Sequence, residues 1–294
     1  MSDEKISWKR GIIWTLITAL FLSAILIYQS YKKPADQLEV YFFDVGQGDS
    51  ALIQKGDQQI LIDGGPDDKV LAELGKVMPL WDRKIETVIL THPHADHITG
   101  INQVISRYQI GKIYFNGTVS GTDQYLNFLN QIKKDKIAAS VPKIGDNFEL
   151  FPDAKLTFLW PGEKYEKITP TDMNDSSEVA NFCYLSKCLL LTGDIQTDEQ
   201  DEMLDYYSKI NQLDLLKSQI IKVAHHGSRN GSSMKLYEVV QPKTAVISVG
   251  KGNQFGHPHK ETLDILNSLA IQILRTDQEG TIKFVFTDGN WVEK

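Results

Sequence analysis

Residues 91–97, THPHADH, decide how the rest of this 294-residue sequence is interpreted. Three of the chain's seven histidines and one aspartate lie between His92 and His97. The residues before them, VILT, are typical of a buried strand, and the residues after them, ITGINQVISRY, are typical of a helix. The cluster is therefore expected in a tight loop between a strand and a helix.

The side chains in this loop are of the types that bind metals. His92 and His94 alternate, so both can point to one side, while Asp96 and His97 point elsewhere. Imidazole and carboxylate groups suit zinc, manganese or iron. We interpret the loop as a source of ligands for two divalent metal ions, Zn or Mn. In the alternative interpretation Asp96 only caps the helix and the histidines are incidental.

Polar side chains also follow other apolar runs at the point where each run ends. Asp44 follows VYFF, Asp63 follows ILI, Asp194 follows LLLTG, and the pair 225–226 follows IIKVA. Strand ends are rigid, and sites are often built from the loops that follow them. We expect these ends to meet at one rim together with His92.

The overall composition is that of a globular protein, with 41% hydrophobic and 23% charged residues. The net charge of −7 argues against a general electrostatic attraction to nucleic acid, which needs a basic surface. A local basic groove remains compatible with this charge, and bound metal ions would add positive charge.

Cys183 and Cys188 flank a turn and could form a disulfide across a hairpin. We favour the alternative, two buried free thiols.

Residues 11–31, GIIWTLITALFLSAILIYQSY, carry no charge. As a helix they would span roughly 31 Å, about the thickness of one hydrocarbon core. Trp8, Trp14, Tyr28 and Tyr31 lie where interfacial aromatic belts are expected. The run is long for the core of a cleaved signal peptide and lacks a clear cleavage site. It also lacks the regularly spaced polar positions of a buried amphipathic helix.

We therefore expect an uncleaved anchor that crosses the cell membrane once. Lys5, Lys9 and Arg10 on one side, against Lys32 and Lys33 on the other, give a weak positive-inside bias. This bias favours a cytoplasmic N-terminus and an extracellular body.

We divide the chain into two parts. Residues 1–37 hold the N-terminal tip, the anchor and a polar linker, and residues 38–294 form one domain. In the domain, strand-like runs come first in bunches and then alternate with helical patterns. This order predicts an α+β fold, with sheets covered by helices and many antiparallel strand pairs.

The segment HPHADH resembles the H-x-H-x-D-H signature of the metallo-β-lactamase fold, a four-layer αββα sandwich of hydrolases. This resemblance implies that Asp63 orients a metal-bound water and that Asp194 bridges two metals. It further implies that His225 or His226 is the last histidine ligand.

Five segments together resemble the extracellular metallo-hydrolase domain of the DNA-uptake competence protein ComEC: FFDVGQGDS, THPHADHITG, LLTGDI, KVAHHGS and FGHPH. The resemblance covers about residues 38–294. Proteins of that kind also carry a multi-helix channel, and here one anchor helix takes its place. The resemblance implies a membrane-anchored phosphodiesterase or nuclease that acts on DNA, with a channel supplied by a separate protein.

The sequence departs from the general family pattern at the first metal site. No histidine lies between Ile98 and Gly193, so that site has His92, His94 and Asp194 but no third imidazole. The ComEC-like run N-D-N-S is here NDSS, residues 174–177. Asp175 or Asn174 is the candidate for the missing ligand, and the alternative is a polar turn before a strand. The second site has Asp96, His97, Asp194 and one histidine of the pair, with His225 preferred over His226.

Further residues are candidates for supporting roles. His257 matches the family's GHPH motif and could donate a proton to the leaving group or hold a phosphate. His259 is expected instead to cap or flank the following helix. Substrate-binding or supporting roles are also considered for Asp44, Gln47, Asp49, Asn174, Ser177 and Ser228.

Metal-assisted hydrolysis follows from this ligand set. Two metals roughly 3.5–4 Å apart would share Asp194 and a hydroxide. DNA is the substrate that the resemblance favours. One alternative is a small phosphodiester of the phosphocholine type, which suits a site tethered near a bilayer. A second alternative is a non-catalytic, metal-bound adaptor of a DNA-uptake complex.

Overall fold

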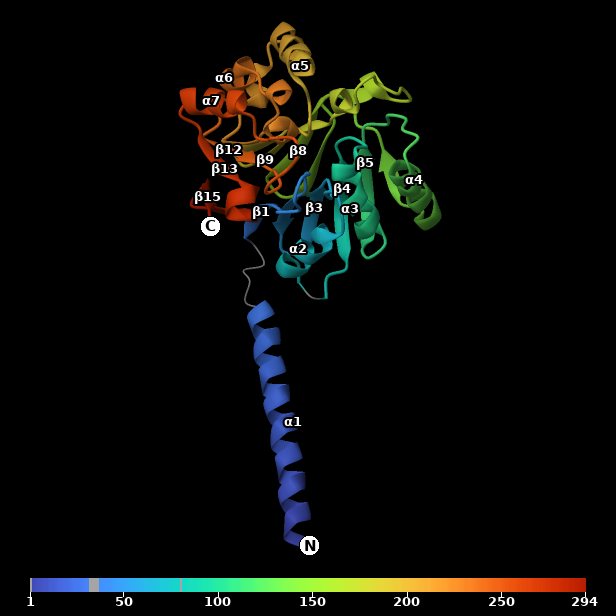
Figure 1. Cartoon of the computed structure of the whole chain (residues 1–294), viewed down its shortest axis with the longest axis vertical. Coiled ribbons are helices and arrows are strands. Elements are labelled where there is room, and N and C mark those ends of the chain that lie inside the picture. The colour runs from blue at the N-terminus through green and yellow to red at the C-terminus, as the bar shows by residue number, and fades with distance from the viewer. Residues whose placement is uncertain (1, 32–36, 80) are drawn as a thin grey trace.

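Two β-sheets packed face to face form the centre of the protein, and helices cover both outer faces (Figure 1). The computed structural model describes residues 2–31, 37–79 and 81–294. The first sheet has the order β15 (Asn290–Glu293), β14 (Ile282–Thr287), β1 (Leu38–Phe42), β2 (Ala51–Lys55), β3 (Gln58–Ile62), β4 (Lys84–Leu90), β5 (Gln109–Phe115), β6 (Ala138–Ser140). The second sheet has the order β13 (Gln272–Arg275), β12 (Thr244–Ile247), β11 (Ile220–Lys222), β10 (Lys187–Leu191), β9 (Val179–Tyr184), β8 (Ala154–Trp160), β7 (Asn147–Phe151).

The helices divide between the two sheets. The first sheet is covered by α2 (Lys69–Val77), α3 (Ala95–Ile105) and α4 (Asp123–Asp135), and the second by α5 (Thr197–Lys209), α6 (Met234–Val240) and α7 (Lys260–Ser268). The short helix α8 (Thr276–Glu279) follows β13, and five 3₁₀ turns are η1 (Gly162–Tyr165), η2 (Met173–Ser176), η3 (Leu213–Leu216), η4 (Ala224–Gly227) and η5 (Arg229–Gly231). The expected α+β, four-layer αββα sandwich is confirmed.

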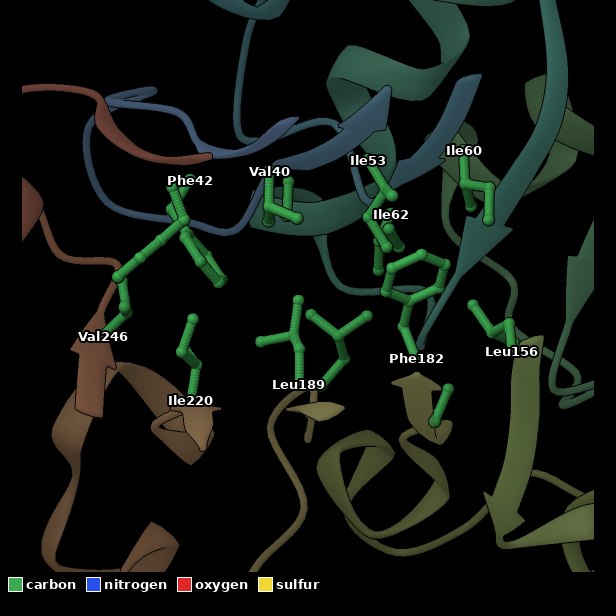
Figure 2. Packing of buried hydrophobic residues seen from close by; sticks show 14 of the residues in the cluster. Val40, Phe42, Ile53, Ile60, Ile62, Leu156, Phe182, Leu189, Ile220 and Val246 are labelled. Atoms are coloured by element: carbon green, nitrogen blue, oxygen red, sulfur yellow. The ribbon is translucent and has the colours of Figure 1, made fainter. Parts of the chain in front are cut away.

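Alternation along the strands explains why the layers form. In β1, Val40 and Phe42 belong to the core between the sheets, while Tyr41 and the following Phe43 belong to the core under the helices. Successive side chains of a strand point to opposite faces, so a strand buried on both sides is apolar throughout. Figure 2 shows the inter-sheet core, where Val40, Phe42, Ile53, Ile60 and Ile62 face Leu156, Phe182, Leu189, Ile220 and Val246.

Parallel pairing brings the polar strand ends to one edge. Strands β3, β4 and β5 are parallel neighbours in the first sheet, and β10, β11 and β12 are parallel neighbours in the second. Their carboxyl ends therefore lie at a common edge of the sandwich. The strands β1 and β2 run antiparallel, so the loop 43–50 between them reaches the same edge.

Helix α3 docks on the loop after β3 through direct backbone contact. The Gly64 amide donates to His97 O at 2.8 Å, and the Gly100 amide donates to Gly65 O at 3.0 Å. A Cβ added at Gly100 would lie 1.8 Å from Gly64 O. The close approach fixes the first turn of α3, which carries Asp96 and His97, against the end of β3.

The two cysteines form a disulfide. Cys183 and Cys188 face each other in the antiparallel register of β9 and β10, and their sulfur atoms are 2.07 Å apart. The expectation of two free thiols is therefore wrong. It was wrong because the register of the hairpin, which decides whether the two side chains meet, cannot be read from the turn residues alone.

The N-terminal helix α1 (Ser2–Tyr31) lies apart from the sandwich (Figure 1). Residues Arg10–Tyr28 have a mean hydropathy of 2.2, and none of this window is buried. By length and composition it is the one helix among the described residues that could cross a membrane. Most of the predicted linker, residues 32–36, lies outside the described residues. The boundary at residue 38 stays a prediction, and β1 begins there.

We predict that Gly100→Ala destabilises the domain by about 1–3 kcal/mol, because the new methyl group overlaps the Gly64 carbonyl. The matched control is Gly75→Ala in α2, where nothing lies within 4 Å of the added Cβ. Helix propensity alone should make the control variant more stable by about 0.5–1 kcal/mol. Urea unfolding of both variants measures the difference. Equal effects of the two substitutions would contradict the proposed docking constraint.

Candidate metal centre

Four potential metal ligands meet at the common edge of the two sheets. Asp96 and His97 come from the first turn of α3, Asp194 from the loop after β10, and His226 from η4 after β11. Their ligand atoms all lie within 4.8 Å of one another. His97, Asp194 and His226 are buried, and the Asp96 side chain is 32% exposed. The cluster is therefore closed on three sides and accessible at Asp96.

Three ligand-atom distances within this cluster are close to those of a tetrahedral metal site, and a fourth is longer. His97 Nε2 and His226 Nε2 each lie 3.3 Å from Asp194 Oδ2. Asp96 Oδ2 lies 3.2 Å from His226 Nε2 and 4.0 Å from His97 Nε2. Ligand bonds of about 2.0–2.1 Å at tetrahedral angles place neighbouring ligand atoms roughly 3.3–3.4 Å apart. Two imidazoles with two carboxylates are a donor set that suits zinc or manganese.

The charges of the cluster show why it attracts a cation. Burial opposes the charged form of His97, but Asp194, Asp63 and Asp96 outweigh it and raise the pKa of this imidazole well above its ordinary value. Burial likewise opposes the charged form of His226, yet Asp194 is among the carboxylates that raise its pKa well above the ordinary value. The negative potential that favours a proton at each Nε2 also favours a divalent metal ion there.

Asp63 supports His97 from behind. Thr91 donates to both Asp63 oxygens, from its amide at 2.8 Å and from its hydroxyl at 2.7 Å. Asp63 Oδ2 also lies 2.8 Å from His97 Nδ1. A carboxylate only accepts, so it keeps a proton on Nδ1 and leaves Nε2 to face the cluster. The structure thus gives Asp63 a positioning contact with a ligand, and its expected role in orienting water stays a prediction.

His226 has a similar support, which includes a lysine that the sequence interpretation missed. His226 Nδ1 lies 3.0 Å from Ser248 O and 3.2 Å from Asp49 Oδ1. The other oxygen of Asp49 pairs with Lys222, and Lys222 Nζ also lies 3.5 Å from Asp194 Oδ1 and donates to Gly193 O at 3.0 Å. Lys222 is 4% exposed. The sequence does contain an indication of this ion pair, because a lysine within the apolar run IIKVA is expected to be buried, and lysines are almost never fully buried without a partner.

The geometry favours His226 over His225, the residue that the sequence interpretation prefers, and the choice of ligand stays a prediction. Both residues have a positive φ, 52° and 53°. His225 Nε2 lies 3.5 Å from Asn174 Nδ2, and its ring centroid is 5.7 Å from that of His257. His226 alone of the pair belongs to the four-ligand cluster found among the described residues. Its Nε2 lies 3.3 Å from Asp194 Oδ2.

The first metal site is only partly assembled. His92 Nε2 lies 3.0 Å from His94 Nδ1, a separation that two ligands of one metal can have. Burial is the main cause that lowers the pKa of His92 well below its ordinary value, which keeps the imidazole neutral. Asn174 is buried near His225, and its Oδ1 has no hydrogen-bond partner among the described residues. Asn174 therefore has a free buried oxygen, and its role as an oxygen ligand of the first site stays a prediction.

Asp175 has a polar partner in the structure, and its predicted role as a metal ligand stays a prediction. Its Oδ1 accepts from Gln196 Nε2 at 3.0 Å, and the same amide donates to Asp172 at 2.9 Å. In the 3₁₀ turn η2, consecutive side chains point in different directions, so Asn174 and Asp175 cannot both face the histidines. The glutamine amide thus holds the Asp175 carboxylate.

Four other candidate residues have structural contacts. Asp44 is exposed, and its Oδ1 accepts from the Gly46 amide at 3.2 Å. Ser177 Oγ accepts from the Asp194 amide at 3.1 Å and so fixes the loop that carries this ligand. Ser228 Oγ accepts from the Asn230 amide at 3.4 Å, at the start of η5. His259 precedes α7, and its Nδ1 accepts from the Arg229 amide at 3.0 Å.

The loop 250–257 brings His257 to the cluster. The ring centroids of His257 and His226 are 6.3 Å apart. Burial, aided by His226, lowers the pKa of His257 to about 4, so the imidazole is neutral at pH 7. Gln47 Oε1 accepts from the Gly250 amide at 3.1 Å, which joins this loop to the loop after β1. Gln47 thus has a supporting contact.

We predict that His226→Ala weakens metal binding by roughly 100-fold or more, since even partners outside the ligand set change metal affinity by about 10–100-fold. The matched control is His225→Ala, which removes the neighbouring imidazole but leaves the four-ligand cluster intact. Competition with a fluorescent chelator for Zn²⁺ and Mn²⁺ measures both affinities, and circular dichroism confirms folding. A larger loss in His225→Ala than in His226→Ala would contradict this assignment.

Comparisons with known proteins identify the family of the chain. The model of the metallo-beta-lactamase superfamily matches residues 43–251. ComE operon protein 3 of Bacillus subtilis is 28% identical over 93% of this chain and 35% of its own length. Competence protein ComA of Neisseria gonorrhoeae is 24% identical, over 94% of this chain and 36% of its own length. The chain therefore spans about a third of the length of these curated relatives.

Solved structures confirm the fold. The metallo-beta-lactamase fold protein YhfI from Bacillus subtilis has a TM-score of 0.52 at 15% identity, covering 81% of this chain and 95% of that protein. Igni18, a metallo hydrolase from Ignicoccus hospitalis, also has a TM-score of 0.52, at 13% identity, covering 85% of this chain and all of that protein. At these identities the likeness concerns the fold alone.

Proposed function

Because this chain belongs to the metallo-β-lactamase superfamily, we propose that it hydrolyses phosphodiester bonds in DNA with divalent metal ions at the Asp96–His97–Asp194–His226 cluster. The observation that carries the proposal is the convergence of these four ligand atoms, which all lie within 4.8 Å of one another. The relation to competence proteins favours DNA as the substrate. A separate channel protein is the partner that such a role would require.

The chain's own residues would prepare the site for this reaction. Bound metal ions would supply Lewis-acid charge and a water whose pKa is lowered to about 7. Asp63 and the Ser248 carbonyl hold the Nδ1 atoms of His97 and His226 by hydrogen bonds of 2.8 and 3.0 Å. The two imidazoles are thereby oriented before substrate arrives, and orientation of this kind lowers the cost of reaching the transition state. His257, neutral at pH 7 and next to the cluster, is placed to hydrogen-bond a phosphate oxygen.

The position of the site argues against a headgroup of the protein's own bilayer as substrate. Strand β1 begins at Leu38, seven residues after α1 ends at Tyr31, and an extended segment of that length reaches at most roughly 25 Å. The cluster lies beyond the opposite end of β1, roughly 17 Å farther along. If α1 spans the membrane, the site faces away from it. This favours a substrate that approaches from the aqueous side.

We predict that the full-length, metal-loaded protein cleaves DNA and that Asp96→Asn reduces the rate by more than about 100-fold. The matched control is Asp57→Asn, which neutralises an exposed carboxylate in the β2–β3 turn, outside the cluster, and should change the rate less than about twofold. The assay compares fluorescent single-stranded DNA with p-nitrophenylphosphorylcholine, in Mn²⁺ and in Zn²⁺.

The alternatives give different results in this assay. Cleavage of the choline ester alone would support a small-molecule phosphodiesterase. Metal binding without cleavage of either substrate would contradict the nuclease proposal and favour the adaptor.

We further propose that residues 38–294 lie outside the cytoplasm, attached to the cell membrane by α1. The disulfide supports this orientation, because disulfides persist in oxidising compartments and are rare in the cytosol. Cys183 and Cys188 should therefore resist alkylation when cells are lysed in acid and treated with a thiol-reactive mass tag. Both should react only after reduction. Two reactive thiols without reduction would contradict this orientation.

A further inference from the structure

An exposed phenylalanine lies beside the metal centre. Phe255 is 54% exposed, although its loop also carries the half-buried His257. The two rings are stacked, with centroids 5.7 Å apart and planes inclined by 24°. The stacking covers one part of the phenyl ring and leaves more than half of the residue's surface to solvent. Exposing this much aromatic surface is unfavourable in the absence of a ligand.

The loop that presents Phe255 is held by a network of hydrogen bonds. Asn253 Oδ1 accepts from the amides of Phe255 and His257, at 3.1 and 3.0 Å. Asn253 Nδ2 donates to Gly250 O at 3.0 Å and to His257 O at 2.8 Å. One side chain therefore fixes both ends of the loop. The hydrogen-bonded loop therefore holds Phe255 in an exposed position. An apolar side chain on a flexible loop would not be held in one position in this way.

The phenyl ring is close enough to the site to contact a bound substrate. The Phe255 ring stacks on the His257 ring, whose centroid lies 6.3 Å from that of His226, a member of the cluster. A strand with one phosphate at the metal centre can therefore bring a neighbouring nucleotide to Phe255. In DNA that nucleotide carries a deoxyribose with its base.

We propose that Phe255 is a stacking platform for a nucleobase next to the scissile phosphate; this rests on the proposed function. Base–aromatic stacking is tolerant of sequence, because every base has a π face. A base inside a duplex is already stacked and cannot reach the platform without being flipped out. The substrate is therefore single-stranded DNA or an unpaired end.

Stacking also explains how an acidic chain can bind this polyanion. The net charge of −7 provides no general attraction to DNA. A stacked base contributes affinity that does not depend on surface charge. Lys251, exposed on the same loop, adds a cation for the backbone.

The test compares Phe255→Ala and Phe255→Trp in the full-length, Mn²⁺-loaded protein. The substrates are an oligothymidylate and a chain of equal length built from abasic tetrahydrofuran phosphodiesters. We expect Phe255→Ala to raise KM for the oligothymidylate by about 5- to 150-fold, and Phe255→Trp to keep it near the wild-type value. Neither variant should change KM for the abasic chain. The matched control is Leu185→Ala, which removes another exposed apolar side chain, 58% exposed, at the β9–β10 turn.

A second readout does not depend on cleavage. Fluorescence of 2-aminopurine in a single-stranded oligonucleotide should be quenched by the wild-type protein and less by Phe255→Ala. Equal KM values for wild type and Phe255→Ala, with the same quenching, would overturn the platform while leaving the proposed function intact. An equal loss on both substrates would also overturn it, since it would mean that Phe255 only supports the loop. A metal-loaded wild type that cleaves no DNA would overturn the proposed function and the platform with it.

Discussion

The contact between His97 and two carboxylates is the interaction on which the site depends. Asp63, at the end of β3 in the first sheet, lies 2.8 Å from Nδ1, and Asp194, after β10 in the second sheet, lies 3.3 Å from Nε2. One imidazole thus joins the two halves of the sandwich. The backbone contact between Gly64 and Gly100 holds the first turn of α3 close enough to the sheet for His97 to contact both carboxylates. If α3 moved outward, His97 would lose its contacts with Asp63 and Asp194, and the cluster would lose one of its four ligands.

Burying so many charges requires compensation within the same network. Asp49 and Asp194 are both buried, and isolated carboxylates in such surroundings would carry a large desolvation penalty. Lys222 lies between them and supplies a positive charge that never leaves the site. His97 and His226 provide further positive charge when protonated, and a metal ion replaces those protons when it binds. The lysine therefore keeps the network neutral enough to fold, and the imidazoles remain available as ligands.

The strand ends and their meeting at one edge follow from the sequence, because apolar runs show where strands end and parallel strands share an edge. The order of side chains within a turn does not follow. His225 and His226 both adopt a left-handed backbone, so the alternation used for strands fails there. Asp175 is held by Gln196, a long-range contact without a local signal. The Cys183–Cys188 disulfide cannot be predicted without the register of the two strands. The buried position of Lys222 cannot be predicted without knowing its carboxylate partners.

Charge and location together constrain how such a chain meets its substrate. An acidic surface repels DNA at long range, so association cannot be steered electrostatically as it is for basic nucleases. In the proposed attachment through α1, the anchor precedes β1 and the site lies beyond the other end of that strand, so the domain would be confined to the membrane surface with its site toward the solution. Confinement next to a channel would raise the local concentration of emerging single strands without requiring tight binding. Short-range contacts, to the metal centre and to Phe255, would then be sufficient to hold a strand end, and weak affinity elsewhere would let the rest of the strand pass.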